Sequence, residues 1–380
     1  MTTAELTVET VHTALAAVID PEIRRPITEL GMVSDVSIDA HGRVRVVVLL
    51  TVSGCPMREQ ITRDVTAAVG RLSGVSAVVV ELDVMSDDQR RALQQQLRGG
   101  APVREIPFAR PDSLTRVYAI ASGKGGVGKS TVTVNLAAAM AGAGLAVGVL
   151  DADVYGHSLP RMLGVTDLPT KVEDMIMPPV AHGIRVISAG MLTRGNAPVA
   201  MRGPMLHKIL EKFLVDVFWG DLDVLLVDMP PGTGDVAISA AQLVPSTEIV
   251  VVTTPQLAAS EVAERAGAMA TLTHQHLAGV VENMAVLACP HCGELIDVFG
   301  SGGGATTAAT LERLTGAPVP LLGSVPIDVR LREGGDRGRP LVLDDPDAPA
   351  AKELRSIAER LSARPRGLVG RPLGLQPVAG

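Results

Sequence analysis

The amino-acid sequence predicts an α/β protein with a mostly parallel sheet covered by helices on both faces, preceded by a small α+β domain. The first observation is a series of short Val/Ile/Leu-rich runs after residue 114, most of them separated by helical segments. Parallel crossovers place such helices over a sheet. The second is a hairpin pattern flanked by helices within residues 1–98. The third is the segment 99–113, whose two Gly, three Pro and lack of periodicity are typical of a linker.

The N-terminal region, residues 1–98, begins with apolar residues at helical spacing over 3–19, and Asp20-Pro21-Glu22 ends that pattern. A turn then separates two runs of alternating apolar residues, which predicts a β-hairpin. Pro56 suits the first position of a helix. After the first helix, the predicted elements are strands 32–38 and 43–51, a helix from 56 to about 72, a strand over 75–84 and a helix over 87–97.

The second region, residues 114–362, carries the parallel sheet. Residues 363–380 follow it and contain three Arg, three Pro and four Gly without an apolar pattern, which predicts a disordered tail. The predicted strands of the second region are 115–121, 145–150, 184–189, 222–228, 247–253, 278–286 and 319–324.

The composition excludes several classes of protein. Hydrophobic residues make up 47% and charged residues 20% of the 380 residues, so the chain can bury a core. Aromatic residues are only 2% and the net charge is -7, so we expect no nucleic-acid partner and no membrane partner. The chain has three cysteines, and its N-terminus carries Glu5 and Glu9 but no basic stretch. We therefore expect a cytoplasmic protein without a disulfide framework or a signal peptide.

A phosphate-binding motif, G-x-x-x-x-G-K-[ST], occupies residues 123–130. It follows an apolar strand and opens a helix at Ser130, which is the context that the motif requires. Backbone N–H groups of the glycines curl around phosphate oxygens, Lys129 supplies a positive charge, and Ser130 would ligate Mg²⁺. The alternative is a glycine-rich turn without a ligand. The residues predicted to bind the nucleotide here are Gly123, Lys124, Gly125, Gly126, Val127, Gly128, Lys129, Ser130 and Thr131.

Carboxylates follow two further apolar strands. Asp151 and Asp153 come after the run that ends at residue 150, and Asp228 ends the run over 222–228. In a parallel sheet such strand ends meet the phosphate loop. We expect Asp228 to hold Mg²⁺ and Asp153 to orient the attacking water, with Asp151 as a lesser candidate. The alternative for each is a solvated turn residue.

The loop also carries a second lysine, Lys124, in the form GKGGVGKS. This form resembles the deviant Walker A motif of the MinD/ParA/ArsA-like ATPases. The resemblance implies that Lys124 reaches the phosphates across a homodimer interface. Together with Lys129 and Asp153, Lys124 is therefore predicted to be a catalytic residue. The resemblance also implies that Asn283, at the end of a late strand, contacts adenine. Without the resemblance, Lys124 would be a solvated loop lysine and Asn283 a turn residue.

Cys289 and Cys292 form a C-x-x-C in the loop that follows the sixth predicted parallel strand. Two thiolates at this spacing can share one metal or one edge of a cluster, but a closed zinc or iron site needs about four ligands. The sequence has no second C-x-x-C, and His274 and His276 belong at the other end of the strand. His291 is expected to be a spacer. Two chains together would complete the site, and a thioredoxin-like dithiol is the alternative.

Several segments together resemble the Mrp (ApbC-like) iron-sulfur cluster carrier ATPases over residues 115 to 345. The tail beyond 363 and the low aromatic content have no counterpart in that resemblance. The resemblance implies that Cys289 and Cys292 bind a 4Fe-4S cluster between two subunits, and that the cluster is transferred to apo-proteins. The segments, in the order seen in the family, are the phosphate loop, MPPGTGD (229–235), TTPQ (253–256), VVENMA (280–285), CPHCG (289–293), Phe299-Gly300, LGSVP (322–326) and Gly335-Asp336.

The N-terminal region resembles the small metal-sulfur cluster biosynthesis domain of the SufT and PaaD type. The resemblance is carried by Asp20-Pro21-Glu22, by residues 29–33 and by residues 51–56. Cys55 is expected at a helix N-terminus, where the dipole favours the thiolate. A buried, unreactive cysteine is an equal alternative, and Asp20 and Glu22 can equally be charges at a helix end.

The sequence therefore predicts a homodimeric, slowly hydrolysing ATPase that uses ATP and Mg²⁺ and carries a 4Fe-4S cluster to apo iron-sulfur proteins. One competing hypothesis is a positioning ATPase of the MinD/ParA kind, which would need a basic amphipathic C-terminal helix or basic patches. Residues 350–362 instead mix both charges. The other is a scaffold whose dimer is ordered by nucleotide and stapled by zinc.

Overall fold

The computed structural model describes residues 6–51, 57–97, 105–153, 156–192, 203–232, 235–256 and 259–363. These residues form two compact units. The small unit comprises the described part of Met1–Arg104 together with Asp167–Pro179 and Asp216–Gly220, and the large unit holds the rest. Cys55 and the predicted tail from residue 364 onward lie outside the described residues.

The small unit has the predicted hairpin and helices. Its three-stranded sheet has the order β1-β2-β3, with β1 antiparallel to β2 and β2 parallel to β3. Helix α2 buries Ile61, Val65 and Val69, which share one face because they are four residues apart. The elements are α1 (Val8–Leu15), β1 (Val33–Ile38), β2 (Arg43–Leu50), α2 (Arg58–Gly70), β3 (Ala77–Val84) and α3 (Asp87–Leu97).

A short hairpin from later in the chain completes the core of the small unit. Strands β6 (Thr170–Val172) and β7 (Met175–Met177) pair antiparallel, and Val172 and Met175 belong to the same buried cluster as Leu15 and Val46. Arg90 Nε lies 3.1 Å from Glu173 Oε1 at the tip of this hairpin. Strands of three residues are too short to show an apolar period, so no sequence pattern predicts that this segment leaves the second region.

The large unit is built on an eight-stranded sheet of order β15-β12-β11-β4-β10-β5-β9-β8. All seven predicted strands are present and pair in parallel, which confirms the predicted fold class, and a two-residue strand, β8, adds an antiparallel edge. Their bounds are β4 (Arg116–Ala121), β5 (Val147–Asp151), β8 (Val180–Ala181), β9 (Ile184–Ser188), β10 (Val224–Asp228), β11 (Glu248–Thr253), β12 (Leu277–Asn283) and β15 (Leu321–Val325).

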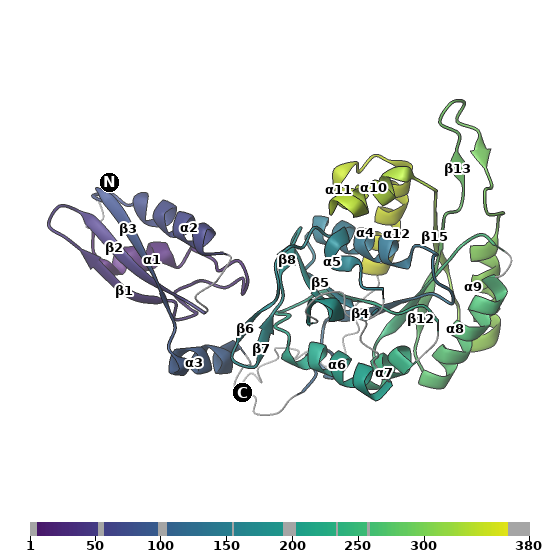
Figure 1. Ribbon diagram of the computed structural model, residues 1–380, viewed down its shortest axis with the longest axis horizontal. Coiled ribbons are helices and arrows are strands. Elements are labelled where there is room, and N and C mark those ends of the chain that lie inside the picture. Colours follow the sequence, from purple (N-terminus) through teal and green to yellow (C-terminus); the bar gives the residue numbers. More distant parts are fainter. Residues whose placement is uncertain are drawn as a thin grey trace, which may run out of the picture. The chain divides into compact units, whose positions relative to one another are not determined.

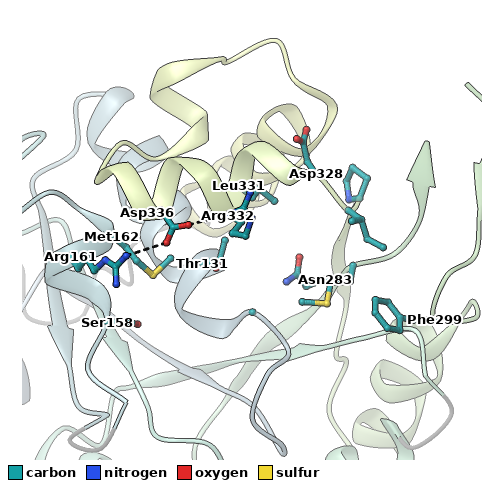
Figure 2. Close-up of a pocket in the computed structure, with 15 residues that line it drawn as sticks. Thr131, Ser158, Arg161, Met162, Asn283, Phe299, Asp328, Leu331, Arg332 and Asp336 are labelled. Atoms are coloured by element: carbon teal, nitrogen blue, oxygen red, sulfur yellow. Dashed lines mark hydrogen bonds and ion pairs between the residues drawn. The ribbon is translucent and has the colours of Figure 1, made fainter. Parts of the chain in front are cut away.

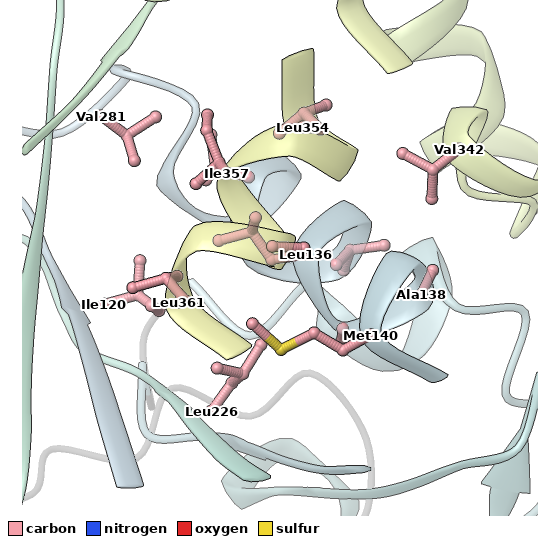
Figure 3. Packing of buried hydrophobic residues seen from close by; sticks show 14 of the residues in the cluster. Ile120, Leu136, Ala138, Met140, Leu226, Val281, Val342, Leu354, Ile357 and Leu361 are labelled. Atoms are coloured by element: carbon pink, nitrogen blue, oxygen red, sulfur yellow. The ribbon is translucent and has the colours of Figure 1, made fainter. Parts of the chain in front are cut away.

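Helices cover both faces of this sheet, and Figure 1 shows α4 and α12 on one side with α6 and α7 on the other. Alternate strand residues face opposite layers. Val250 and Val281 pack with α4 and α12, as Figure 3 shows for Val281, whereas Val251 and Val280 pack with α8 and α9. The helices are α4 (Lys129–Gly142), α5 (Leu159–Met162), α6 (Gly203–Asp216), α7 (Asp235–Leu243), α8 (Ala259–Thr273), α9 (Gly303–Thr315), α10 (Val329–Arg337), α11 (Leu341–Asp344) and α12 (Pro349–Ser362).

Two connecting segments differ from their prediction. Part of the predicted linker is ordered, because residues 107–109 form a 3₁₀ turn in which Phe108 is buried. The predicted loop after the sixth parallel strand contains a small hairpin, β13 (Leu287–Ala288) and β14 (Leu295–Ile296), which projects from the sheet beside α9 (Figure 1). Within the described residues, no helix is both long and apolar enough to cross a membrane.

Candidate nucleotide site and exposed cysteine pair

The phosphate loop lies between β4 and α4, in the predicted order of strand, loop and helix. Gly126 and Gly128 have positive φ values of 80° and 79°, a backbone region that L side chains rarely adopt. A Cβ at Gly128 would also collide with the side-chain amide of Asn283. Glycine at this position therefore permits both the loop conformation and its close contact with β12.

Three side chains of α4 converge on Asp228, at the carboxyl end of β10. Lys129 Nζ and Ser130 Oγ lie 2.6 and 2.7 Å from Asp228 Oδ2, and Thr133 Oγ1 lies 2.7 Å from Oδ1. Strand β10 pairs directly with β4, so its end is adjacent to the loop. Lys129 and Asp228 are 6% and 1% exposed, and each charge is compensated by the other in a place that water hardly reaches.

A second buried carboxylate, Asp151, lies beside this cluster. It ends β5 and is paired in register with Asp228 on β10. Its oxygens accept hydrogen bonds from the backbone N–H of Asp153 and of Leu159 and from the Ser188 hydroxyl, at 3.2, 3.3 and 3.2 Å. Burial, with a further contribution from the Asp228 charge, raises the pKa of Asp151 to about 7. The site thus places, beside the Lys129–Asp228 ion pair, a carboxyl group that gains a proton readily near neutrality.

The other two predicted catalytic side chains lie in loops. Asp153 is half-buried, and its Oδ1 accepts a hydrogen bond of 2.9 Å from the backbone N–H of Gly156. Lys124 Nζ lies 2.6 Å from Gln256 Oε1 in the loop that follows β11. Within this chain, Lys124 is therefore held over the edge of the sheet by a neutral amide.

A cavity of about 390 Å³ opens next to the loop (Figure 2). Asn283 lines it, and its side-chain N–H group donates to the carbonyl of Val127 at 2.9 Å. Figure 2 shows Arg161 and Asp336 together on one side and Phe299 on the other. Much of the lining is apolar, which suits a flat ring held beside a phosphate loop. The apolar side chains that line the cavity are Met162, Met284, Phe299, Pro326, Ile327 and Leu331.

The cysteine pair occupies the turn of the β13–β14 hairpin. Backbone hydrogen bonds from Cys289 N to Glu294 O and from Gly293 N to Cys289 O, at 2.8 and 2.9 Å, fix the turn. Cys289 is half-buried and Cys292 is exposed. The backbone N–H groups of Cys292 and His291 hold the pKa of the Cys289 thiol below its usual range, which favours the thiolate that binds metal.

This turn supplies two thiol ligands and no more. Among the described residues, no group of three or more His, Cys, Asp and Glu side chains is arranged to hold a metal ion. The hairpin also exposes apolar side chains, with Leu295 68% and Ile296 44% exposed. An incomplete ligand set with apolar surface around it is a site that another protein surface can complete.

Two family models match the chain. The model described as a NUBPL iron-transfer P-loop NTPase matches residues 113–362. The chain belongs to this family. A second model, described as an iron-sulfur cluster assembly protein, matches residues 8–82 of the small unit.

Curated relatives of this iron-transfer family extend over nearly the whole chain. An iron-sulfur cluster carrier protein of Mycobacterium tuberculosis is 62% identical and covers 97% of this chain and 96% of its own. Its namesake in Bacillus subtilis is 37% identical and covers 91% and 94%. Among solved structures, a nucleotide-binding protein of Archaeoglobus fulgidus in complex with ADP is 34% identical, with a TM-score of 0.55, covering 66% of this chain and 96% of its own.

The structure shows contacts of three residues to which the sequence motifs assigned no role. Thr133 and Gln256 contact predicted site residues, and Phe299 lines the cavity although it follows the cysteine hairpin. Thr133 lies one helical turn after Lys129, and that spacing was a usable signal. The contacts of Gln256 and Phe299 depend on tertiary structure, so no local pattern could have revealed them.

Proposed function

We propose that this iron-transfer P-loop NTPase binds and hydrolyses ATP, holds a 4Fe-4S cluster at a homodimer interface and transfers it to apo-proteins in the cytoplasm. The observation that carries the proposal is the pair of half-buried Cys289 and exposed Cys292 at the turn of a hairpin in the unit that also contains the phosphate loop. The cluster is the cargo of the protein rather than a resident cofactor. The names of the curated relatives support the same function.

The nucleotide half of the proposal assigns a role to each side chain around Asp228. Lys129 neutralises phosphate charge, and the backbone N–H groups of Gly125 to Ser130 surround the phosphate oxygens. The Ser130 hydroxyl and the Asp228 carboxylate, 2.7 Å apart, offer the oxygen ligands that Mg²⁺ prefers and would hold it. Bound there, Mg²⁺ would offset charge on the phosphates. Asp153 orients the attacking water, and Asn283 with the cavity next to it holds the adenine.

The cluster half of the proposal follows from the ligand count. One chain offers two thiolates, and a 4Fe-4S cluster takes four. A two-fold axis beside the hairpin brings a second pair from an identical chain. The exposed Leu295, Ile296 and Val298 then become buried between the subunits, and an acceptor protein replaces that contact when it takes the cluster.

The fold argues against the positioning-ATPase alternative. A membrane-binding helix needs a free apolar face. In α12 that face, with Leu354, Ile357 and Leu361, is buried against α4 and the sheet (Figure 3). The last described helix is therefore part of the core and offers no apolar surface to a membrane.

Cysteine substitutions test the proposal. Protein purified or reconstituted without oxygen is expected to contain iron and sulfide at about four each per dimer. Cys289→Ser and Cys292→Ser should each abolish both, whereas His291→Ala, between them in the same turn, should retain them. Measurement of iron, acid-labile sulfide, zinc and visible absorption distinguishes the outcomes. Stoichiometric zinc without sulfide would contradict the proposal and leave a zinc-stapled dimer.

A further inference from the structure

The helix that follows the cysteine hairpin, α9, is anchored at its first turn by a buried carboxylate. The backbone N–H of Gly304 donates to Glu282 Oε1 at 2.7 Å, and the hydroxyl of Ser324 on β15 donates to Glu282 Oε2 at 2.9 Å. Glu282 is 6% exposed. A Cβ at Gly304 would lie 2.6 Å from the Glu282 Cβ, so glycine allows helix and strand to approach this closely.

Glu282 is the neighbour of Asn283, and the two face opposite layers of the sheet. Successive side chains of a strand alternate between its faces. Val281 packs in the α4 layer and Val280 in the α9 layer, which places Asn283 with α4 and Glu282 with α9. Asn283 lines the nucleotide cavity and donates to the phosphate loop at Val127. The last two residues of β12 thus hold the phosphate loop on one face and the start of α9 on the other.

Two further contacts join the start of α9 to the nucleotide side. A Cβ at Gly303 would lie 2.6 Å from both the carbonyl oxygen of Thr254 and the carbonyl carbon of Pro255, so α9 rests directly on that backbone. The next residue, Gln256, holds Lys124. Phe299, between the hairpin and α9, lines the nucleotide cavity itself. Together with the hydrogen bond from Gly304 to Glu282, these contacts join residues 299–304 at three places to residues next to the nucleotide site.

We propose that Glu282 is a positioning residue that couples nucleotide binding to the cysteine hairpin. A nucleotide that contacts the phosphate loop and Asn283 favours one position of the end of β12. Because the carboxylate of Glu282 is hydrogen-bonded to Gly304 N, a shift at the end of β12 moves the start of α9 and with it the segment between Cys292 and α9. This inference rests on the proposed function for its purpose, since it explains how ATP changes the hold on the cluster. The contacts themselves exist in one chain.

Conservative substitutions at Glu282 test the coupling without leaving a large cavity at this buried position. Glu282→Asp keeps the charge but is one methylene too short to reach Gly304 N. Glu282→Gln keeps an acceptor oxygen at full length and is the rescue variant. Glu353→Ala is the matched control, because Glu353, on α12, accepts a hydrogen bond of 3.1 Å from the backbone N–H of the same Ser324.

The first readout is amide hydrogen exchange of residues 289–306 in the full chain with and without ATP and Mg²⁺. We expect nucleotide to change exchange there by about fivefold or more in the wild type, the lower end of typical coupling. Glu282→Gln and Glu353→Ala should keep that response, and Glu282→Asp should lose it while still binding ATP. An equal response in Glu282→Asp and the wild type would overturn the inference. So would an equal loss in Glu282→Asp and Glu353→Ala.

The second readout separates this inference from the proposed function. In cluster-loaded protein, the ratio of cluster transfer rates with and without ATP should fall to about one in Glu282→Asp, whereas cluster content and ATP hydrolysis remain. A wild type that binds no cluster would refute the proposed function, and the exchange measurement would still decide whether Glu282 couples the two segments. A Glu282→Asp protein with the wild-type rate ratio would refute the coupling alone.

Discussion

The nucleotide site and the cysteine hairpin are opposite kinds of site on one unit. Around Asp228, charges and hydroxyls are buried and paired within a single chain. At the hairpin, two thiols and several apolar side chains face outward with half of a ligand set. The cluster around Asp228 is therefore complete in its side chains within the fold, whereas the hairpin depends on another protein surface for its remaining ligands. Damage to the buried cluster around Asp228 should therefore act within one chain, whereas damage to the hairpin should act only on assemblies.

The largest expected effect in the nucleotide site comes from Lys129→Ala. The substitution removes the cation that faces the phosphates, and we expect ATP hydrolysis to fall on the order of 10²- to 10³-fold. It also leaves Asp228 buried without its partner charge, which costs roughly 3 to 5 kcal/mol of folding free energy. Turnover assays and denaturant titration measure the two effects. Lys352→Ala, at an exposed lysine of α12, is the control and should change neither.

Because the cysteine hairpin is separate from the nucleotide site, cluster binding should survive in Lys129→Ala protein that remains folded. Iron and sulfide content measured at a temperature below its unfolding transition checks this. Equal ATP turnover in Lys129→Ala and the wild type would refute the assignment of the phosphate loop.

A second pair of substitutions separates the two carboxylates assigned to nucleotide chemistry. Asp228→Ala should weaken Mg²⁺-dependent ATP binding, because it removes the carboxylate that is hydrogen-bonded to Ser130 and that would hold Mg²⁺ together with it. Asp153→Asn should leave binding unchanged and slow hydrolysis by about 10²-fold, the lower range for loss of a group that handles protons or orients water. Calorimetric titration with ATP and Mg²⁺ and a phosphate-release assay report the two steps. Matching defects in both variants would show that the roles are not separate.

Asp151 predicts a pH dependence of stability within the nucleotide site. Burial raises the pKa of this carboxyl in the folded state to about 7 from its ordinary value of 3.8. Between those two values the unfolded chain loses this proton and the folded chain keeps it, so this carboxyl lowers stability as the pH rises from about 4 to 7, by at most about 4 kcal/mol. Asp151→Asn should flatten that slope, whatever its effect on absolute stability.

Denaturant titrations of the wild type and Asp151→Asn at pH 5 and pH 8 measure the Asp151 effect. The variant must lose less stability than the wild type over this interval. A parallel fall in both proteins would assign the slope to other groups.

The smallest expected effect comes from Lys124→Ala, which tests whether the nucleotide site also depends on a second chain. Lys124 is held by Gln256 in its own chain, yet we propose that it acts on the phosphates bound by a partner subunit. Lys124→Ala should then lower turnover several-fold and remove the dependence of specific activity on protein concentration. Gln256→Ala, which frees Lys124, should keep that dependence. Turnover measured across a concentration series decides. If the specific activity of the wild type does not depend on protein concentration, the nucleotide site is complete in one chain and the role of Lys124 across subunits is refuted.

Much of the fold could be predicted from sequence because its signals are local. The buried parallel strands of the large unit are rich in Val, Ile and Leu. The phosphate motif by itself predicts the strand before it, the loop and the helix after it. Carboxylates at strand ends were expected near the loop, and β5 and β10 do place Asp151 and Asp228 side by side.

The remaining features depend on contacts between distant parts of the chain. The hairpin of β6 and β7 joins the small unit only because Val172 and Met175 fill its core. The pKa of Asp151 follows from burial beside Asp228, and the role of Glu282 from its contact with Gly304. No local sequence pattern encodes these contacts, so only the structure could show them.

The proposed function requires that one chain holds half of a cluster site. Native mass spectrometry of anaerobically reconstituted protein tests it most directly, since it weighs the assembly with its inorganic content. We predict a species of two chains with one 4Fe-4S cluster, and cluster-free protein when Cys289→Ser is introduced. A single chain that carries a complete cluster, or two chains with one zinc ion and no sulfide, would contradict the account.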